Sequence, residues 1–151
     1  MPLSFLEETT ALLAELERQR LPYAIAGAVA LAIHGVPRAT TDIDLLVEPQ
    51  DLDAVLGVAR VRRFTVEALP MKFSDGMEVR RVHKLEGPEM LTLDLLLVNP
   101  NLATVWASRE RVSTEHGEFW VVSRQGLIQM KAWAGREQDL ADIRRLEELD
   151  R

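Results

Sequence analysis

The sequence contains no cysteine, which excludes disulfide bridges and cysteine-based zinc or iron–sulfur centres. It has only three histidines, and because they are scattered along the chain, a histidine-based metal site is not expected either. Long apolar runs are also missing, since no stretch approaches the roughly eighteen residues of a membrane-spanning helix. Met1 is followed by a proline and an acidic segment instead of a basic and then apolar leader. These absences predict a cytoplasmic protein without membrane association.

The chain has 151 residues, of which 47% are hydrophobic and 28% charged, and we expect one domain spanning residues 1–151. The net charge of −6 argues against broad, non-specific binding of nucleic acid. Basic side chains nevertheless gather in the middle of the sequence: Arg60, Arg62, Arg63, Lys72, Arg80, Arg81 and Lys84. This group suits either solvated strand faces or a rim that attracts phosphates, and the sequence leaves both interpretations open.

Hydrophobic periodicity and turn signals predict strands mixed with helices, followed by a helical C-terminal segment. The expected helices span residues 3–20, 28–34, 51–59, 103–109, 124–134 and 136–149. The expected strands span residues 23–26, 42–47 and 90–98, with one hairpin joining Val66 to Val79 and another within residues 111–122. The residues expected to face the core include the three tryptophans and, in the last helix, Leu140, Ile143, Leu146 and Leu149. The predicted class is α/β (α+β), with one mixed, twisted sheet flanked by helices.

Two aspartates stand where the buried strand 42–47 should begin, although aspartate is depleted in strands. Because residues i and i+2 of a strand point to the same face, Asp42 and Asp44 should project together, roughly 7 Å apart. Like charges at that separation raise each other's pKa unless a cation lies between them. Mg²⁺ suits this role, because it binds carboxylate oxygens together with substrate phosphates.

A third aspartate, Asp94, lies in the centre of the apolar strand 90–98. An unpaired carboxylate is very costly to bury, so Asp94 needs a partner. One interpretation is a structural salt bridge to an arginine. The other is that Asp94 lies beside Asp42 and Asp44 on a neighbouring strand and completes a three-carboxylate centre for Mg²⁺ or Mn²⁺.

The segment before these aspartates offers a place for an anion. An apolar strand meets Gly27 and continues at once as a helix of small residues. Backbone N–H groups at such a turn, with the positive end of the helix dipole, favour a bound phosphate, which Gly27 and Ala28 allow to approach closely. The turn alone is a common packing device, but the Asp-x-Asp sequence downstream makes the combination more specific.

These motifs resemble the nucleotidyltransferase superfamily of the DNA polymerase β type. The resemblance lies in Gly27-Ala28, thirteen further residues, Asp42-Ile43-Asp44, and a third aspartate on a later strand. Residues 23–47 and the C-terminal pattern of a helix lysine, Lys131, followed by Arg-x-x-Asp-x-x-Asp are most similar to AbiEii-type nucleotidyltransferases, which include toxins of toxin–antitoxin systems. The resemblance implies a minimal nucleotidyltransferase fold.

The resemblance also implies residue roles. Asp42 and Asp44 would bind both ions of a two-metal site for Mg²⁺ or Mn²⁺, and Asp94 would bind the catalytic ion and help to activate the attacking hydroxyl. Gly27 and Ala28 would cradle the triphosphate of a nucleoside triphosphate. Ala28 departs from the Gly or Ser that the family prefers, so it offers backbone N–H groups only.

Several further residues keep two interpretations. Lys131 would reach the triphosphate, or it is a surface lysine, and Asp139 would act near the substrate or hold Lys131. The pair formed by Asp139 and Asp142 could also be the solvated side of the last helix. Arg38 faces the phosphates or forms a salt bridge with an aspartate. Thr41 is a candidate substrate contact, although Thr40 and Thr41 also suit turn and cap positions.

The function predicted from these patterns is metal-dependent transfer of a nucleoside monophosphate from a nucleoside triphosphate to an RNA or protein hydroxyl. An antitoxin or regulator is the expected partner if the protein is a toxin component, and a homodimer is considered. The alternative is a non-catalytic module that binds a nucleotide or a partner protein, and a weaker alternative is a two-metal phosphohydrolase. The sequence leaves the base preference and the acceptor open.

Overall fold

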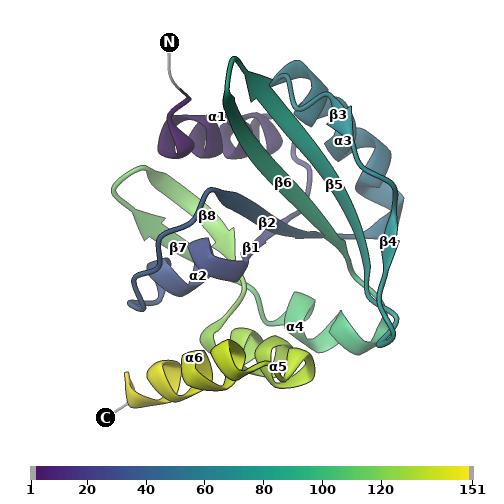
Figure 1. The fold of residues 1–151 in the computed structure, drawn as a ribbon. Coiled ribbons are helices and arrows are strands. Elements are labelled where there is room, and N and C mark those ends of the chain that lie inside the picture. Colours follow the sequence, from purple (N-terminus) through teal and green to yellow (C-terminus); the bar gives the residue numbers. More distant parts are fainter. Residues whose placement is uncertain (1–2, 150–151) are drawn as a thin grey trace.

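The computed structural model describes residues 3–149, which form one mixed β-sheet flanked by six α-helices (Figure 1). The helices are α1 (Phe5–Arg18), α2 (Gly27–Ile33), α3 (Leu52–Val61), α4 (Ala103–Ala107), α5 (Arg124–Ala134) and α6 (Glu137–Glu148). The strands are β1 (Ala24–Ala26), β2 (Asp42–Val47), β3 (Val66–Glu67), β4 (Met71–Lys72), β5 (Glu78–Glu86), β6 (Glu89–Leu97), β7 (Glu110–Thr114) and β8 (Gly117–Val121). The fold class predicted from the sequence is confirmed.

The strands lie in the order β3–β5–β6–β2–β1–β8–β7, and β4 also pairs with β5. The central strand β2 is parallel to β6 and antiparallel to β1. Its consecutive residues Leu45, Leu46 and Val47 are all fully buried, so both faces of this strand are covered. A strand covered on both faces needs a continuous apolar sequence, which is what β2 has after its first three residues.

The helices form two groups. Helix α1 contacts α3, whereas α5 contacts α2, α4 and α6. The first group lies in the upper part of Figure 1, and the α4–α6 segments lie below the sheet. Ser4 caps α1 by accepting a hydrogen bond from the backbone of Glu7, as its sequence pattern predicts. Within residues 3–149, no helix is both long and apolar enough to cross a bilayer.

One predicted hairpin is wrong in its pairing. The turn at residues 74–76 joins β4 to β5, so that Met71 pairs with Val79, whereas Val66 in β3 pairs with His83. Pro70 separates the two short strands, and proline cannot donate a hydrogen bond to a sheet ladder. The sequence between Val66 and Val79 therefore forms two short strands on β5 instead of one continuous strand.

The buried face of α6 differs from the predicted one. Leu140 and Leu149 are 49% and 47% exposed, while the buried side chains are Asp139, Asp142 and Leu146. The interpretation of Asp139 and Asp142 as solvated residues is therefore wrong. A prediction based on apolar residues alone gives the wrong face of α6, because two carboxylates of the true face are buried against basic side chains of other segments.

Candidate functional site

A cleft of about 710 Å³ brings most of the predicted site residues together. The predicted residues that line it are Gly27, Ala28, Asp42, Asp44, Asp94, Lys131 and Asp139. They come from α2, β2, β6, α5 and α6, which are far apart in the sequence. The cleft also has an apolar wall, formed by Met71, Phe73, Met77, Met130 and Trp133. The lining thus combines charged groups with surfaces for an apolar or aromatic ligand.

The three aspartates lie at matched positions of two parallel strands. Asp44 of β2 stands directly opposite Asp94 of β6, and Asp42 stands opposite Thr92. This register confirms that Asp94 lies beside the Asp-x-Asp pair on a neighbouring strand. On the far side of β6, Arg81 of β5 stands opposite Asp94. Its guanidinium donates from Nε to Asp94 Oδ1 at 2.7 Å and from an Nη atom to Oδ2 at 2.9 Å. Asp94 therefore forms a salt bridge with an arginine and also lies beside the Asp-x-Asp pair, so both interpretations of this residue apply.

The carboxyl groups of Asp42 and Asp44 have no such partner. Within residues 3–149, no hydrogen bond or ion pair reaches their side-chain oxygens. Burial, followed by the nearby negative charges of Asp94 and Asp42, raises the pKa of Asp44 to about 7, although the positive charges of Arg81 and Lys131 lower it. The site thus concentrates negative charge that its own cations only partly balance.

Asp44 also explains the glycine at position 27. Gly27 has φ +62°, and a Cβ built there would lie 2.0 Å from Asp44 Oδ2 and 2.8 Å from Asp44 Cγ. No side chain fits at either distance, and the positive φ disfavours any residue with a Cβ. Glycine is therefore required for the strand-to-helix turn to lie against the Asp44 carboxyl group.

Oxygen ligands on neighbouring strands suit a hard divalent cation. However, among the side chains of residues 3–149, no group of three or more Asp, Glu or His is arranged to hold a metal ion. In this conformation Asp94 is held by Arg81 instead. Asp42 and Asp44 still fit a cation, because they are adjacent and unpaired, and Mg²⁺ commonly takes one or two carboxylates with waters and substrate phosphates. Metal binding remains a prediction.

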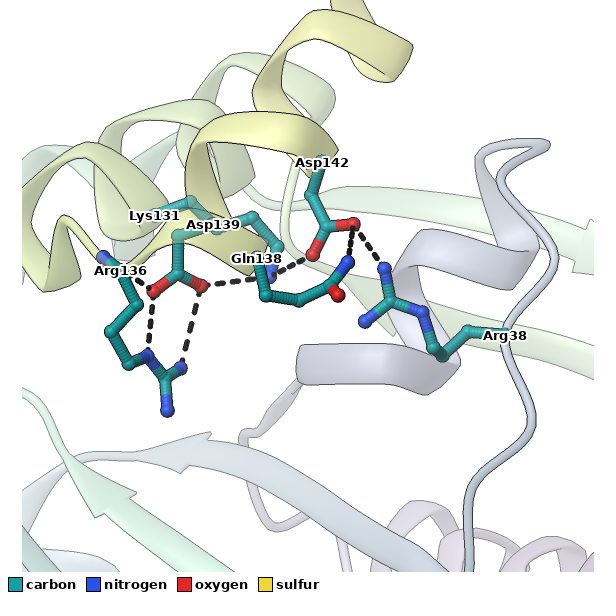
Figure 2. A network of polar contacts seen from close by, with 6 residues as sticks. All are labelled: Arg38, Lys131, Arg136, Gln138, Asp139 and Asp142. Carbon is teal, nitrogen blue, oxygen red and sulfur yellow. Dashed lines mark hydrogen bonds and ion pairs between the residues drawn. The ribbon is translucent and has the colours of Figure 1, made fainter.

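Lys131 and the two buried aspartates of α6 form a polar network that joins α5 to α6 (Figure 2). Lys131 Nζ lies 3.3 Å from Asp139 Oδ1 and 2.9 Å from Asp142 Oδ2. Arg136 adds a backbone bond of 3.2 Å and a guanidinium bond of 2.7 Å to Asp139 Oδ2. The expectation that Asp139 holds Lys131 agrees with this geometry. Because an ammonium group has three N–H donors, one remains for a ligand in the cleft.

Arg38 and Thr41 are not among the cleft-lining residues. Arg38 forms an ion pair with Asp142, which ties the segment before β2 to α6, so its salt-bridge interpretation is confirmed. Thr41 is exposed, whereas Thr40 lines the cleft and accepts a 2.7 Å hydrogen bond from the backbone of Asp42. The structure thus favours Thr40 over Thr41 as the residue beside the aspartates, in the turn role that the sequence also allowed.

Asp142 is expected to matter for stability because its side chain is completely buried. Burial alone would raise its pKa, but Lys131, Gln138 and Arg38 together lower the pKa below its usual 3.8. Asp142→Asn should therefore cost about 2 kcal/mol of unfolding free energy at pH 7, since it removes the charge from a buried ion pair. Urea titrations of both proteins would measure this difference.

The pH dependence has a defined sign. A depressed folded-state pKa gives stability that is full above pH 4 and is lost as the pH falls below that value. The gap between the wild type and Asp142→Asn should therefore narrow between pH 5 and pH 3. Glu147→Gln, on an exposed position of the same helix, is the matched control and should leave stability nearly unchanged. Equal losses in both variants would contradict a specific role for Asp142.

The sequence interpretation missed the contribution of the middle of the chain. Arg81 was one of seven basic residues with no feature to separate it from its neighbours, and only the pairing of β5 with β6 places it beside Asp94. Among the other six, Lys84 is buried and bonds Glu8 of α1 at 2.6 Å. Trp133 is 43% exposed and lines the cleft, so its assignment to the core is wrong, while Trp106 and Trp120 pack against the core.

Comparisons with solved structures identify similar folds. TM1012 from Thermotoga maritima, a candidate nucleotidyltransferase, superposes with a TM-score of 0.68 at 13% identity, over 95% of this chain and 92% of that chain. The antibiotic-resistance factor ANT(2'')-Ia in solution matches with a TM-score of 0.61 at 13% identity, over 95% and 84% of the two chains. Its crystal structure with adenylyl-2''-tobramycin matches with a TM-score of 0.61 at 15% identity, over 93% and 87%.

The sequence itself matches no protein-family model and no curated protein. At the low identity of the structural matches, the similarity concerns the fold. Each superposition covers more than nine tenths of this chain. The chain therefore has the nucleotidyltransferase fold, and the resemblance to the AbiEii-type group rests on sequence motifs alone.

Proposed function

We propose that the protein is a metal-dependent nucleotidyltransferase that transfers a nucleoside monophosphate from a nucleoside triphosphate to a hydroxyl group. The observation that carries the proposal is the convergence of Asp42, Asp44 and Asp94 on one cleft with the Gly27 turn and Lys131. These groups come from four separate elements, α2, β2, β6 and α5, of a nucleotidyltransferase fold. A purely structural role explains none of the unpaired charge at Asp42 and Asp44.

Each residue has a role in this proposal. Asp42 and Asp44 would hold Mg²⁺ or Mn²⁺, which when bound supplies the positive charge that a phosphoryl transfer requires. Gly27 and Ala28 present backbone to the triphosphate, and Lys131 donates its remaining N–H to a phosphate oxygen. Asp94 lies beside the reacting groups as a proton acceptor for the attacking hydroxyl. Most of the rate enhancement would come from positioning and charge stabilisation.

The acceptor in this proposal is an RNA or protein hydroxyl. The structure of ANT(2'')-Ia with an adenylylated aminoglycoside adds the hydroxyl of a small molecule as a third class to test. The apolar wall formed by Met71, Phe73, Met77, Met130 and Trp133 would receive the base or the acceptor. The motif resemblance to AbiEii-type proteins extends the proposal to a toxin with an antitoxin or regulator partner, in a cytoplasmic setting and with a homodimer as a further state to test.

A second candidate is a non-catalytic module that binds a nucleotide or a partner protein. Two observations favour it. Ala28 lacks the hydroxyl that a serine would offer to a phosphate. Asp94 is already held by Arg81, so the three carboxylates are not free to bind one metal site together. Binding of a nucleotide without transfer would distinguish this candidate from the enzyme.

The deciding experiment is transfer of label from each α-³²P nucleoside triphosphate in Mg²⁺ or Mn²⁺. Total RNA, whole-cell protein and an aminoglycoside panel would serve as acceptors. We expect transfer to one class by the wild type and a loss of at least about 10²-fold in Asp42→Ala, because a charge-stabilising group is removed from the site. Asp53→Asn, an exposed carboxylate on α3, should retain full activity.

The other outcomes are equally informative. Nucleotide binding that persists in Asp42→Ala, with no transfer by either protein, would favour the non-catalytic module. Release of pyrophosphate without a labelled acceptor would indicate a phosphohydrolase. Transfer that survives in Asp42→Ala would remove the aspartates from the mechanism and overturn the proposal.

A further inference from the structure

Arg81 is placed to act as a fixed cation within the carboxylate cluster. It stands opposite Asp94 in the β5–β6 ladder, and Asp94 stands opposite Asp44 in the β6–β2 ladder. The three side chains therefore form one row across three neighbouring strands. Both oxygens of Asp94 accept hydrogen bonds from the guanidinium, at 2.7 and 2.9 Å. This bidentate arrangement is the geometry of the strongest arginine–carboxylate contacts.

The contact changes what Asp94 can offer to a metal ion. A carboxylate that already bonds a guanidinium through both oxygens presents less negative charge, and the adjacent positive charge repels a second cation. Asp94 is only 7% exposed, so solvent screens this repulsion weakly. Asp42 and Asp44, in contrast, have no hydrogen-bond or ion-pair partner for their carboxyl groups within residues 3–149 and remain available as ligands.

The balance of charge also favours a single bound cation. Three ionised aspartates carry three negative charges, of which Arg81 balances one, and a single divalent cation would balance the other two. Lys131 adds little to this balance, because Asp139 and Asp142 surround its ammonium group at 3.3 and 2.9 Å. A second divalent cation would give Arg81 and the three aspartates an excess of positive charge before any phosphate binds.

We propose that Arg81 takes the place of one metal ion, so that the protein binds one divalent cation, on Asp42 and Asp44, instead of two. The inference rests on the proposed metal-dependent function. It assigns Arg81 as a positioning residue that fixes Asp94 and excludes a cation from it. Such a site has two positive centres, the bound metal ion and the Arg81 guanidinium, of which the second is part of the protein chain.

The test is the number of Mn²⁺ ions bound per chain, measured without nucleotide from the free-Mn²⁺ signal in electron paramagnetic resonance. The wild type should saturate at one ion. Arg81→Met and Arg81→Gln should each saturate at two, because Asp94 is released as a ligand. Arg81→Lys should remain at one, since it keeps the positive charge beside Asp94.

The matched control is Arg80→Met, which removes the same charge from the adjacent position of β5. Successive residues of a strand face opposite sides, and Arg80 is not among the cleft-lining residues, so this variant should bind one ion. Circular dichroism of each variant checks that it is folded, and two neutral replacements at position 81 guard against the failure of either one.

The outcomes separate this inference from the function that it rests on. Two ions bound by the wild type, or one ion bound by both neutral Arg81 variants, would overturn the role of Arg81 and leave a metal-dependent enzyme intact. No Mn²⁺ bound by any variant would overturn the metal site and the inference with it. A second ion in Arg80→Met as well would show a general effect of charge, which also contradicts a specific contact.

Discussion

Replacing Gly27 by alanine is expected to destabilise the protein by about 3 kcal/mol, as the sum of backbone strain and steric overlap. The strain arises because φ at this position is +62°. The overlap arises because the new Cβ would lie 2.0 Å from Asp44 Oδ2, so that either the turn or the Asp44 carboxyl group must move. Denaturant titration measures the loss of stability, and the same variant should lose the transfer activity proposed above.

The steric part of this effect can be isolated. Gly87 has a similar φ of +58°, but nothing lies within 4 Å of a Cβ built there, so Gly87→Ala should cost only about 1 kcal/mol. Gly27→Ala should also cost less in an Asp44→Ala background than in the wild type, because the two nearest atoms are then absent and the effect of the Asp44 charge is the same on both sides of the comparison. A Gly27→Ala variant no less stable than Gly87→Ala would contradict the contact with Asp44.

The second large effect is expected at Asp44. Asp44→Asn should reduce transfer by at least about 10²-fold, because it removes a negative charge on which the proposed cation depends. The same change should raise the unfolding free energy of the metal-free protein by about 2 kcal/mol at pH 8, because a half-buried carboxylate beside Asp94 and Asp42 is replaced by a neutral group. The site would then gain stability as it loses function.

The sign of the pH dependence follows from the pKa of about 7 that the folded protein gives to Asp44. An unfolded chain releases this proton near the ordinary value of 3.8, so wild-type stability falls as the pH rises from 4 to 7. The advantage of Asp44→Asn should therefore be full above pH 7 and should vanish near pH 4.

Urea titrations in a chelator at pH 4.5, 6 and 8 would measure this trend. Asp53→Asn, which changes an exposed carboxylate, should show no such dependence. An Asp44→Asn variant less stable than the wild type at pH 8 would contradict the account, because it would mean that the ionised carboxylate is compensated in the folded state.

Local sequence rules account for the part of the site that is continuous in the chain. The strand, the glycine turn and the short helix follow from the sequence of residues 23–34 and are found in the structure at nearly the predicted bounds. The period of two in a strand places Asp42 and Asp44 on one face, and an acidic residue in an apolar strand singles out Asp94. These inferences succeed because each depends on spacing within one element.

Other features required the tertiary structure, because they depend on which elements become neighbours. Arg81 differs in no local respect from Arg80, and only the register of β5 against β6 brings it to Asp94. The buried face of α6 contains Asp139 and Asp142, which hydrophobic periodicity cannot identify, since their burial depends on Lys131 and Arg38 arriving from other segments.

The sequence by itself thus determined the strand and turn at residues 23–34, the fold class and the three candidate aspartates. Residue spacing and the cost of burying a charge can both be judged from the sequence without knowing which elements are neighbours. The tertiary structure alone decided how each charge is paired: Asp94 with Arg81, Asp142 with Lys131 and Arg38, and Asp44 with no cation among residues 3–149. The reason is physical, since an ion pair depends on distance in space, and strands joined by long connections bring together residues that no spacing rule relates.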